Sequence, residues 1–134
     1  MIKKLRLTED LDVNFSLFSI ISHEKSYKLC WRINKKLQIN LGRVEPLTLL
    51  KSGSFHRYRH LNESEKIEVV SNRSLKGFLD TKDKKVNYFL KIEKPFFERQ
   101  KSNLISKLND VSEILLIFEV DLEKDIHKKE LFYD

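Results

Sequence analysis

The segment Ser54–His60 carries the most suggestive chemical pattern in the chain, because basic side chains alternate there with aromatic rings and imidazoles. Arginine and aromatic residues at alternating positions could follow a phosphate backbone and stack bases, as in proteins that bind single-stranded nucleic acid. Basic residues further along would extend this patch. The full candidate set is His56, Arg57, Tyr58, Arg59, His60, Arg73 and Lys76. The competing interpretation, which we favour, is a solvated hairpin whose aromatic side chains pack on neighbouring strands.

A second candidate is an anion site formed by Ser22, His23 and Ser26, where a strand should turn into a helix. The first turn of a helix offers unpaired N–H groups and the positive end of the helix dipole, which together can hold a phosphate. No glycine-rich loop is present that would let a ligand approach the backbone. A serine hydroxyl that simply caps the helix explains the same residues, and we favour that interpretation.

The other reactive residue types do not combine into a site. Cys30 and His23 would lie about 10 Å apart along a helix, which is too far for a hydrogen bond. His56 and His60 would be roughly 13 Å apart in a strand, and no cysteine or close carboxylate completes a metal site with them. Glu119 stands alone in an apolar segment, so it makes no acid–base pair. We therefore expect no catalytic residue, no metal and no cofactor.

Strands and helices must position these residues. The segment 86–121 has the clearest pattern of strands and helices in the chain. It contains two apolar segments, 86–92 and 114–120, that alternate as strands do, and a helical segment from Pro95 to Asn109. The side chains expected to pack together are Val86, Tyr88, Leu90 and Ile92 of the first strand, Ile114, Leu116, Phe118 and Val120 of the second, and Phe97, Leu104, Ile105, Leu108 and Val111 of the helix. Strand, helix and strand form a crossover unit of one sheet.

Upstream, residues 13–21 predict a strand, and a helix runs from the turn at 22–26 to about Gln38. Residues 54–60 and 65–71 predict a hairpin. The buried stripe of the first helix is expected to be Tyr27, Cys30, Trp31, Asn34 and Leu37. This order of elements predicts an α+β two-layer sandwich with a mostly antiparallel sheet and two helices on one face. A ferredoxin-like arrangement with one added strand is the nearest named topology.

Length and composition set limits on the class of protein. At 134 residues the chain should form one domain, 1–134, with a C-terminal tail at 122–134. It contains no apolar segment of membrane-spanning length, and we expect neither a secretion signal nor a membrane partner. The single cysteine fits a reducing cytoplasm. The net charge of +6 suits nucleic acid, but a chain without alanine and rich in lysine and asparagine also reflects an AT-rich gene.

Gly77-Phe78-Leu79 and, further on, Val86-Asn87-Tyr88-Phe89-Leu90 form a recognisable pattern. It resembles the signature of the IPExxxVDY family, which comprises small bacterial proteins of unknown function. Segments 21–23, 27–31, 71–74 and 118–121 are similar to that family too, so the likeness covers nearly the whole chain. The Ile-Pro-Glu triplet of the signature would fall on Asp80, Thr81 and Lys82, and its Asp on Asn87. Because those letters differ here, we interpret the signature as a structural turn into a strand.

The second face of the sheet needs a cover. Neighbouring strand residues point to opposite faces, so Phe89, Leu115 and Ile117 should face away from the helices and form an interface. Either the tail folds back through its apolar residues Ile126, Leu131 and Phe132, which we favour, or a second subunit packs there.

Three functions are compatible with these patterns. The first is a non-catalytic interaction module of the cytoplasm that binds an unknown protein or a second copy of itself. The second is an RNA-binding accessory protein that uses the hairpin 54–60. The third is a small enzyme whose site the sequence does not reveal.

Overall fold

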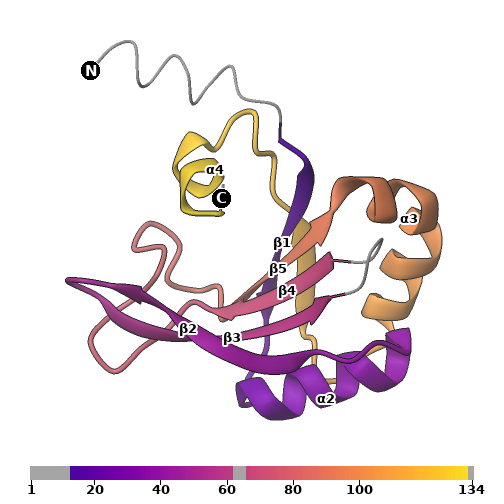
Figure 1. Cartoon of the computed structure of the whole chain (residues 1–134), viewed down its shortest axis with the longest axis horizontal. Coiled ribbons are helices and arrows are strands. Elements are labelled where there is room, and N and C mark those ends of the chain that lie inside the picture. The colour runs from indigo at the N-terminus through magenta and orange to yellow at the C-terminus, as the bar shows by residue number, and fades with distance from the viewer. Residues whose placement is uncertain (1–12, 62–65, 133–134) are drawn as a thin grey trace.

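The computed structural model describes residues 13–61 and 66–132, with the side chain of Leu61 left aside (Figure 1). The elements in chain order are β1 (Phe15–Ile21), α2 (Ser26–Leu37), β2 (Gly42–Leu49), β3 (Gly53–Leu61), β4 (Lys66–Ser71), β5 (Tyr88–Glu93), α3 (Lys94–Asn109), β6 (Leu116–Glu119) and α4 (Ile126–Phe132). The six strands form one sheet in the order β2-β3-β4-β5-β1-β6, and every neighbouring pair is antiparallel. The expected α+β class is confirmed.

The crossover predicted from the sequence is present. β5 and β6 both pair antiparallel with β1, so they run parallel to each other, and α3 joins them with β1 between. The order β6-β1-β5-β4, with α2 and α3, is the ferredoxin-like part of the sheet. Two strands extend it instead of one, because Gly42–Leu49 is also a strand. Pro46 conceals this strand in the sequence, and the pairing of β2 shifts register between Val44 and Leu47.

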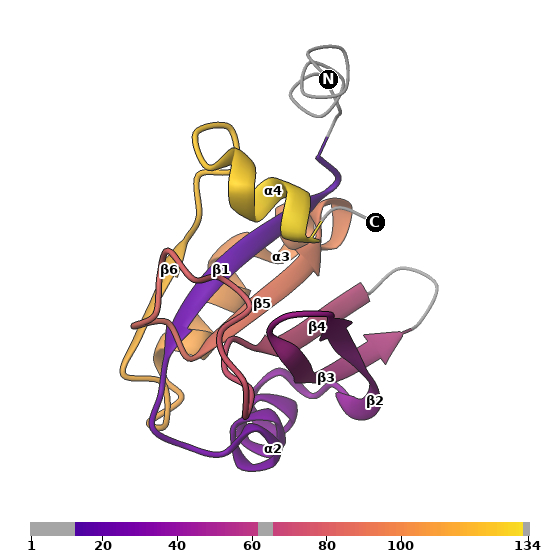
Figure 2. The ribbon, with the colours of Figure 1, turned by 90° about the vertical axis from the view of Figure 1, so that its left-hand side faces the viewer.

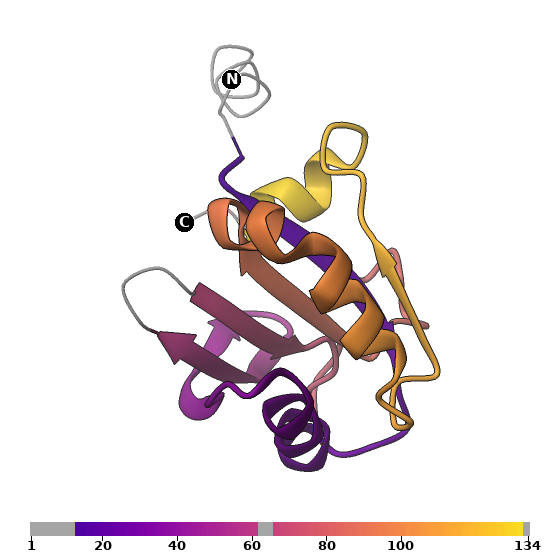
Figure 3. The ribbon, with the colours of Figure 1, turned by 90° about the vertical axis from the view of Figure 1, so that its right-hand side faces the viewer.

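The first face of the sheet is covered by α2 and α3, as predicted (Figure 3). Phe97, Leu104 and Leu108 of α3 are buried there against Tyr88 and Leu90 of β5. Pro95 occupies the first turn of α3, where its missing N–H costs no hydrogen bond.

The second face is covered by the 72–87 loop and by α4 (Figure 2). Its buried residues are Phe15, Leu17, Phe55, Val70 and Phe89 of the sheet, Leu79 and Val86 of the loop, and Leu122 and Phe132 of the tail. The rings of Phe89 and Phe132 lie 5.1 Å apart between centroids. The favoured prediction, that the tail folds back over this face, is confirmed. β1 is buried on both faces because it lies between two cores.

The buried stripe of α2 differs from the prediction. Leu29, Cys30 and Ile33 are buried, whereas Tyr27 is 63% exposed and Trp31 is 47% exposed. Both stripes follow the helical repeat, so spacing alone could not separate them. The stripe that is buried carries the aliphatic side chains, and the rejected one included Asn34.

The faces of β6 are also the reverse of the prediction. Ile117 pairs with Ile20 of β1 and packs toward the helices, while Phe118 pairs with Ser19 on the second face and is 42% exposed. The expectation that Phe118 lies in the main core is therefore wrong. The prediction takes Ile114 as the start of the alternation, but the strand begins only at Leu116, after a bend at Leu115 that shifts the alternation by one residue.

Candidate interaction surfaces

The hairpin residues predicted to bind RNA are divided between the two faces of β3. Phe55 belongs to the core of the second face, and Tyr58 to the core of the first. Both rings are buried, so neither offers a surface on which a base could stack. The interpretation as a packed hairpin fits this geometry.

The hairpin arginines are engaged within the sheet. The Nη2 atom of Arg59 lies 2.7 Å from Oε1 of Glu68, and Nε of Arg57 lies 3.6 Å from the same oxygen. Arg57 also donates a hydrogen bond of 3.0 Å to the carbonyl of Glu45. Because Glu68 is buried, the two arginines serve to neutralise it.

The remaining members of the predicted nucleic-acid set do not gather around these arginines. His56 points to α2, where its Nδ1 lies 3.1 Å from Oγ of Ser26, and Nδ1 of His60 accepts a hydrogen bond of 3.0 Å from the Asn40 amide. Arg73 and Lys76 are exposed on the 72–87 loop, and Lys76 lies beside the first residue of β3.

At the predicted anion site the two serines make internal hydrogen bonds. Oγ of Ser22 accepts one of 3.2 Å from the Glu24 amide, and Oγ of Ser26 lies 3.4 Å from the hydroxyl of Tyr58. His23 is exposed. The N-cap of α2 is Lys25, whose side chain makes no capping hydrogen bond. The expectation that a serine hydroxyl caps this helix is therefore wrong.

The predicted interface residues Phe89, Leu115 and Ile117 do not share a face. Phe89 is buried under the tail, Ile117 packs against the helix-side core, and Leu115 is 56% exposed before β6 begins. The prediction of one common face is wrong for the same reason as for Phe118, the bend at Leu115.

The outer surface of α2 forms a basic and aromatic face, which the predicted stripe divides because it places Tyr27 and Trp31 in the core. We call it the α2 face; its members are Tyr27, Lys28, Trp31, Arg32, Lys35 and Lys36. Nζ of Lys35 lies 3.9 Å from the Trp31 ring centroid, and the guanidinium of Arg32 lies 4.9 Å from it. The sequence contains a signal for this face. The stripe that is buried in the structure includes every aliphatic residue of the helix, and these are Leu29, Ile33 and Leu37.

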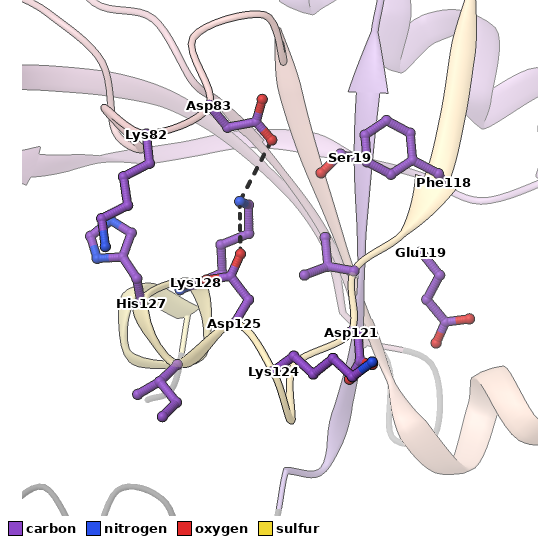
Figure 4. A pocket seen from close by; sticks show the side chains of 12 residues that line it. Ser19, Lys82, Asp83, Phe118, Glu119, Asp121, Lys124, Asp125, His127 and Lys128 are labelled. Atoms are coloured by element: carbon purple, nitrogen blue, oxygen red, sulfur yellow. Dashed lines mark hydrogen bonds and ion pairs between the residues drawn. The ribbon is translucent and has the colours of Figure 1, made fainter.

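A groove of about 640 Å³ lies between the end of β6 and α4, with a buried ion cluster at one wall. Figure 4 shows the Lys128 ammonium between Asp83 and Asp125, with Ser19 and Phe118 across the groove. Nζ of Lys128 lies 3.0 Å from Asp125, 3.6 Å from Asp83 and 2.8 Å from Asp80. No sequence pattern indicates this cluster, because its two halves, 80–83 and 125–128, are far apart in the chain.

Electrostatics in the cluster favour the charged forms. Burial lowers the pKa of Lys128, but hydrogen bonds to Asp80 and Asp125 outweigh this effect, so its pKa lies above the usual value. Burial raises the pKa of Asp125, yet hydrogen bonds from the backbone and ammonium of Lys128 bring it below its usual value. The cluster thus joins α4 to the 72–87 loop by structural ion pairing.

The single thiol is not activated. Cys30 is buried in the helix-side core, and burial raises its pKa to about 12. A neutral thiol without access to solvent is a poor nucleophile. Within residues 13–61 and 66–132, no group of three or more His, Cys, Asp and Glu side chains is placed to hold a metal ion.

The two edges of the described sheet differ in chemistry. β2 carries exposed Arg43 and Glu45, followed by Pro46 and a register shift, all of which discourage pairing with another strand. At the opposite edge Leu116 of β6 is 52% exposed beside the exposed Phe118. The edge at β6 is therefore mainly apolar, with Glu119 as the one exposed charge of the strand.

In comparisons with known proteins, no family model and no curated protein matches this chain. Among the described residues, no helix is both long and apolar enough to cross a membrane.

Proposed function

We propose that this chain is a non-catalytic, cytoplasmic interaction module that pairs with a second copy of itself through the open edge of β6. The observation that carries this proposal is the exposure of Leu115, Leu116 and Phe118 at an edge strand, while the other edge is protected. An unprotected apolar edge is a template for strand addition.

The backbone of β6 supports the pairing. The amide of Val120 donates a hydrogen bond of 2.8 Å to the carbonyl of Leu17 in β1. Because backbone direction alternates along a strand, the polar groups of Ile117 and Glu119 point the other way, toward the open edge. These groups can pair with an added strand.

A two-fold axis at Ile117 gives a self-complementary register. In an antiparallel pair centred there, Leu116 of each copy lies opposite Phe118 of the other, on the second face of the sheet. Glu119 falls opposite Leu115, so no like charges meet. Beside the edge, a hollow of about 130 Å³ between α3 and β6 can take an apolar side chain from the added strand.

The size of the surface predicts a weak dimer. Three half-exposed side chains offer a few hundred Å² per copy, which is less than the roughly 1,200 Å² in total that stable specific complexes bury. We therefore expect association that depends on protein concentration in the high micromolar range.

Sedimentation velocity over a concentration series tests this proposal. The wild-type protein should shift from monomer to dimer as concentration rises, and Phe118→Lys should stay monomeric, because a charge at the edge opposes pairing. Leu75→Lys is the matched control, since Leu75 is a fully exposed leucine on the 72–87 loop. This control should dimerise like the wild type. A wild-type protein that is still monomeric near about 1 mM, or a Phe118→Lys variant that dimerises normally, would rule out pairing at β6.

We further propose that the chain is a divergent member of the IPExxxVDY family. Supporting this, the signature segment is a structural piece, with Leu79 and Val86 buried under the tail and Tyr88 buried under α2 and α3. Asn72, which precedes the segment, holds it with hydrogen bonds to the carbonyls of Asp83 and Val86. The Glu and Asp of the signature are replaced here by Lys82 and Asn87. A role of the signature in folding is compatible with this loss of its acidic residues.

A further inference from the structure

We propose that the α2 face binds single-stranded nucleic acid, with bases stacked on Trp31 and Tyr27 and phosphates held by the surrounding lysine and arginine side chains. This site lies on a different element from the open edge of β6 and does not depend on pairing there. It also differs from the hairpin 54–60, whose aromatic rings are buried.

The aromatic row is built for stacking. Tyr27 and Trp31 are four residues apart in α2, so they lie on the same side of the helix about 6 Å apart at Cβ. Both rings are substantially exposed, although tryptophan is highly buried on average in folded proteins. Two neighbouring bases have a stacking platform there, and stacking of a base on an aromatic ring contributes to binding whatever the base.

The cations surround this row. Lys35 continues it one turn further, with its ammonium over the Trp31 ring. The second row consists of Lys28, Arg32 and Lys36, whose ion pairs with carboxylates measure 3.2 Å to Glu24, 3.0 Å to Glu113 and 3.9 Å to Asp110. The three cations are 41–46% exposed, and ion pairs at such surface positions contribute little to stability. They can therefore be exchanged for phosphate contacts, and this exchange should make binding sensitive to salt.

The aromatic and basic composition favours single strands over other polyanions. A duplex keeps its bases stacked inside, so it would meet only the cations of the face. Helices that bind an anionic membrane insert an apolar face into it. The apolar face of α2 is instead packed on the sheet. The exposed rings thus serve a ligand with accessible π-faces.

Fluorescence titration with a short oligouridine at about 50 mM salt tests the site directly. Trp31 is the only tryptophan of the chain, so its emission reports on the site itself. We expect quenching on binding, and a loss of affinity of about 30-fold or more in Trp31→Ala and Tyr27→Ala combined, because both stacking rings are then removed, measured by anisotropy of a labelled oligonucleotide. Lys35→Glu should weaken binding, while Lys85→Glu, the same charge change on the exposed 72–87 loop, should affect it much less.

Two further probes separate bases from charge. An abasic oligonucleotide of equal length should bind clearly more weakly than oligouridine. Equal binding of the two, with no effect of the aromatic variant, would show attraction by charge alone and overturn the proposal. It would also be overturned if oligouridine fails to bind at about 50 mM salt, or if only anionic phosphatidylglycerol vesicles change the emission of Trp31.

Discussion

Lys128 of α4 holds its ammonium 2.8 Å from Oδ2 of Asp80, and both side chains are buried. The opposite oxygen of Asp80 accepts a hydrogen bond of 3.0 Å from the Lys82 amide. Since Asp80 belongs to the 72–87 loop and Lys128 to the tail, this pair joins the two segments that cover the second face of the sheet.

Breaking this pair from one side should be costly. Lys128→Met leaves the fully buried carboxylate of Asp80 without its cation, so we expect a loss of about 3–5 kcal/mol in the free energy of unfolding by urea. The double variant Lys128→Met with Asp80→Asn removes the uncompensated charge and should be more stable than Lys128→Met alone. A double variant that is the less stable of the two would show that the charge of Asp80 is not the source of the loss.

Acid should weaken the same contact between α4 and the loop through Asp125. Its pKa in the folded protein lies below the usual value because of Lys128, so its contribution is present above a pH of about 4 and is lost as pH falls through the folded pKa. Urea unfolding between neutral pH and about pH 3 should give a steeper decline for the wild type than for Asp125→Asn. If the free energy of unfolding declined equally with falling pH in the wild type and in Asp125→Asn, the role of Asp125 would be contradicted.

Alkaline pH should lower stability through Cys30. In the unfolded chain this thiol ionises near its ordinary pKa of about 9, whereas burial raises the folded pKa to about 12. The native state therefore binds more protons in this interval, and the free energy of unfolding should fall with rising pH, by at most about 1.4 kcal/mol per pH unit for this group. Cys30→Ala should have a flatter profile above about pH 8.5. Burial also raises the pKa of Tyr88 to about 12, but this group is present in both proteins, so the difference between the two profiles reports on Cys30.

Much of the fold followed from local patterns, because the crossover unit has strong strand alternation, a helical stripe and a proline in the first turn. The patterns failed where a shift of one residue decides which side chains of a helix or strand point into the core. For α2, two stripes satisfied the same repeat, and for β6 a bend at Leu115 shifted the count by one residue. The strand β2 was missed because Pro46 lies inside it.

The candidate surfaces were harder to predict because they depend on which side chains meet in space. Arg59 and Glu68 lie on neighbouring strands, and that pairing, invisible in the sequence, turns an apparent phosphate contact into an ion pair within the sheet. The α2 face, in contrast, depends only on the choice of stripe. Its residues were within reach of sequence reasoning.

The tail should contribute strongly to stability through Phe132. Its ring packs on Phe89 in the second core, and its carbonyl accepts a hydrogen bond of 2.7 Å from Lys91. Phe132→Ala should cost about 3–5 kcal/mol, measured by chemical denaturation. Leu131, which is only partly buried against the same core, is the matched comparison, and Leu131→Ala should cost less. Equal, small losses for both would mean that the tail does not cover this face in solution.

Trp31 and Ile33 provide the sharpest test of how α2 is oriented, because they are two residues apart and have opposite environments. Ile33→Ala removes a fully buried side chain and should cost about 2–5 kcal/mol. Trp31→Ala removes a ring that is half exposed and that has Arg32 and Lys35 in cation–π contact, so it should cost less than Ile33→Ala, about 1 kcal/mol. In the wild type, acrylamide should readily quench the emission of Trp31 in the folded state, because about half of the side chain is exposed. A tryptophan shielded from acrylamide, together with a larger loss of stability for Trp31→Ala than for Ile33→Ala, would show that the helix buries the stripe predicted from its sequence. The α2 face would then not be exposed.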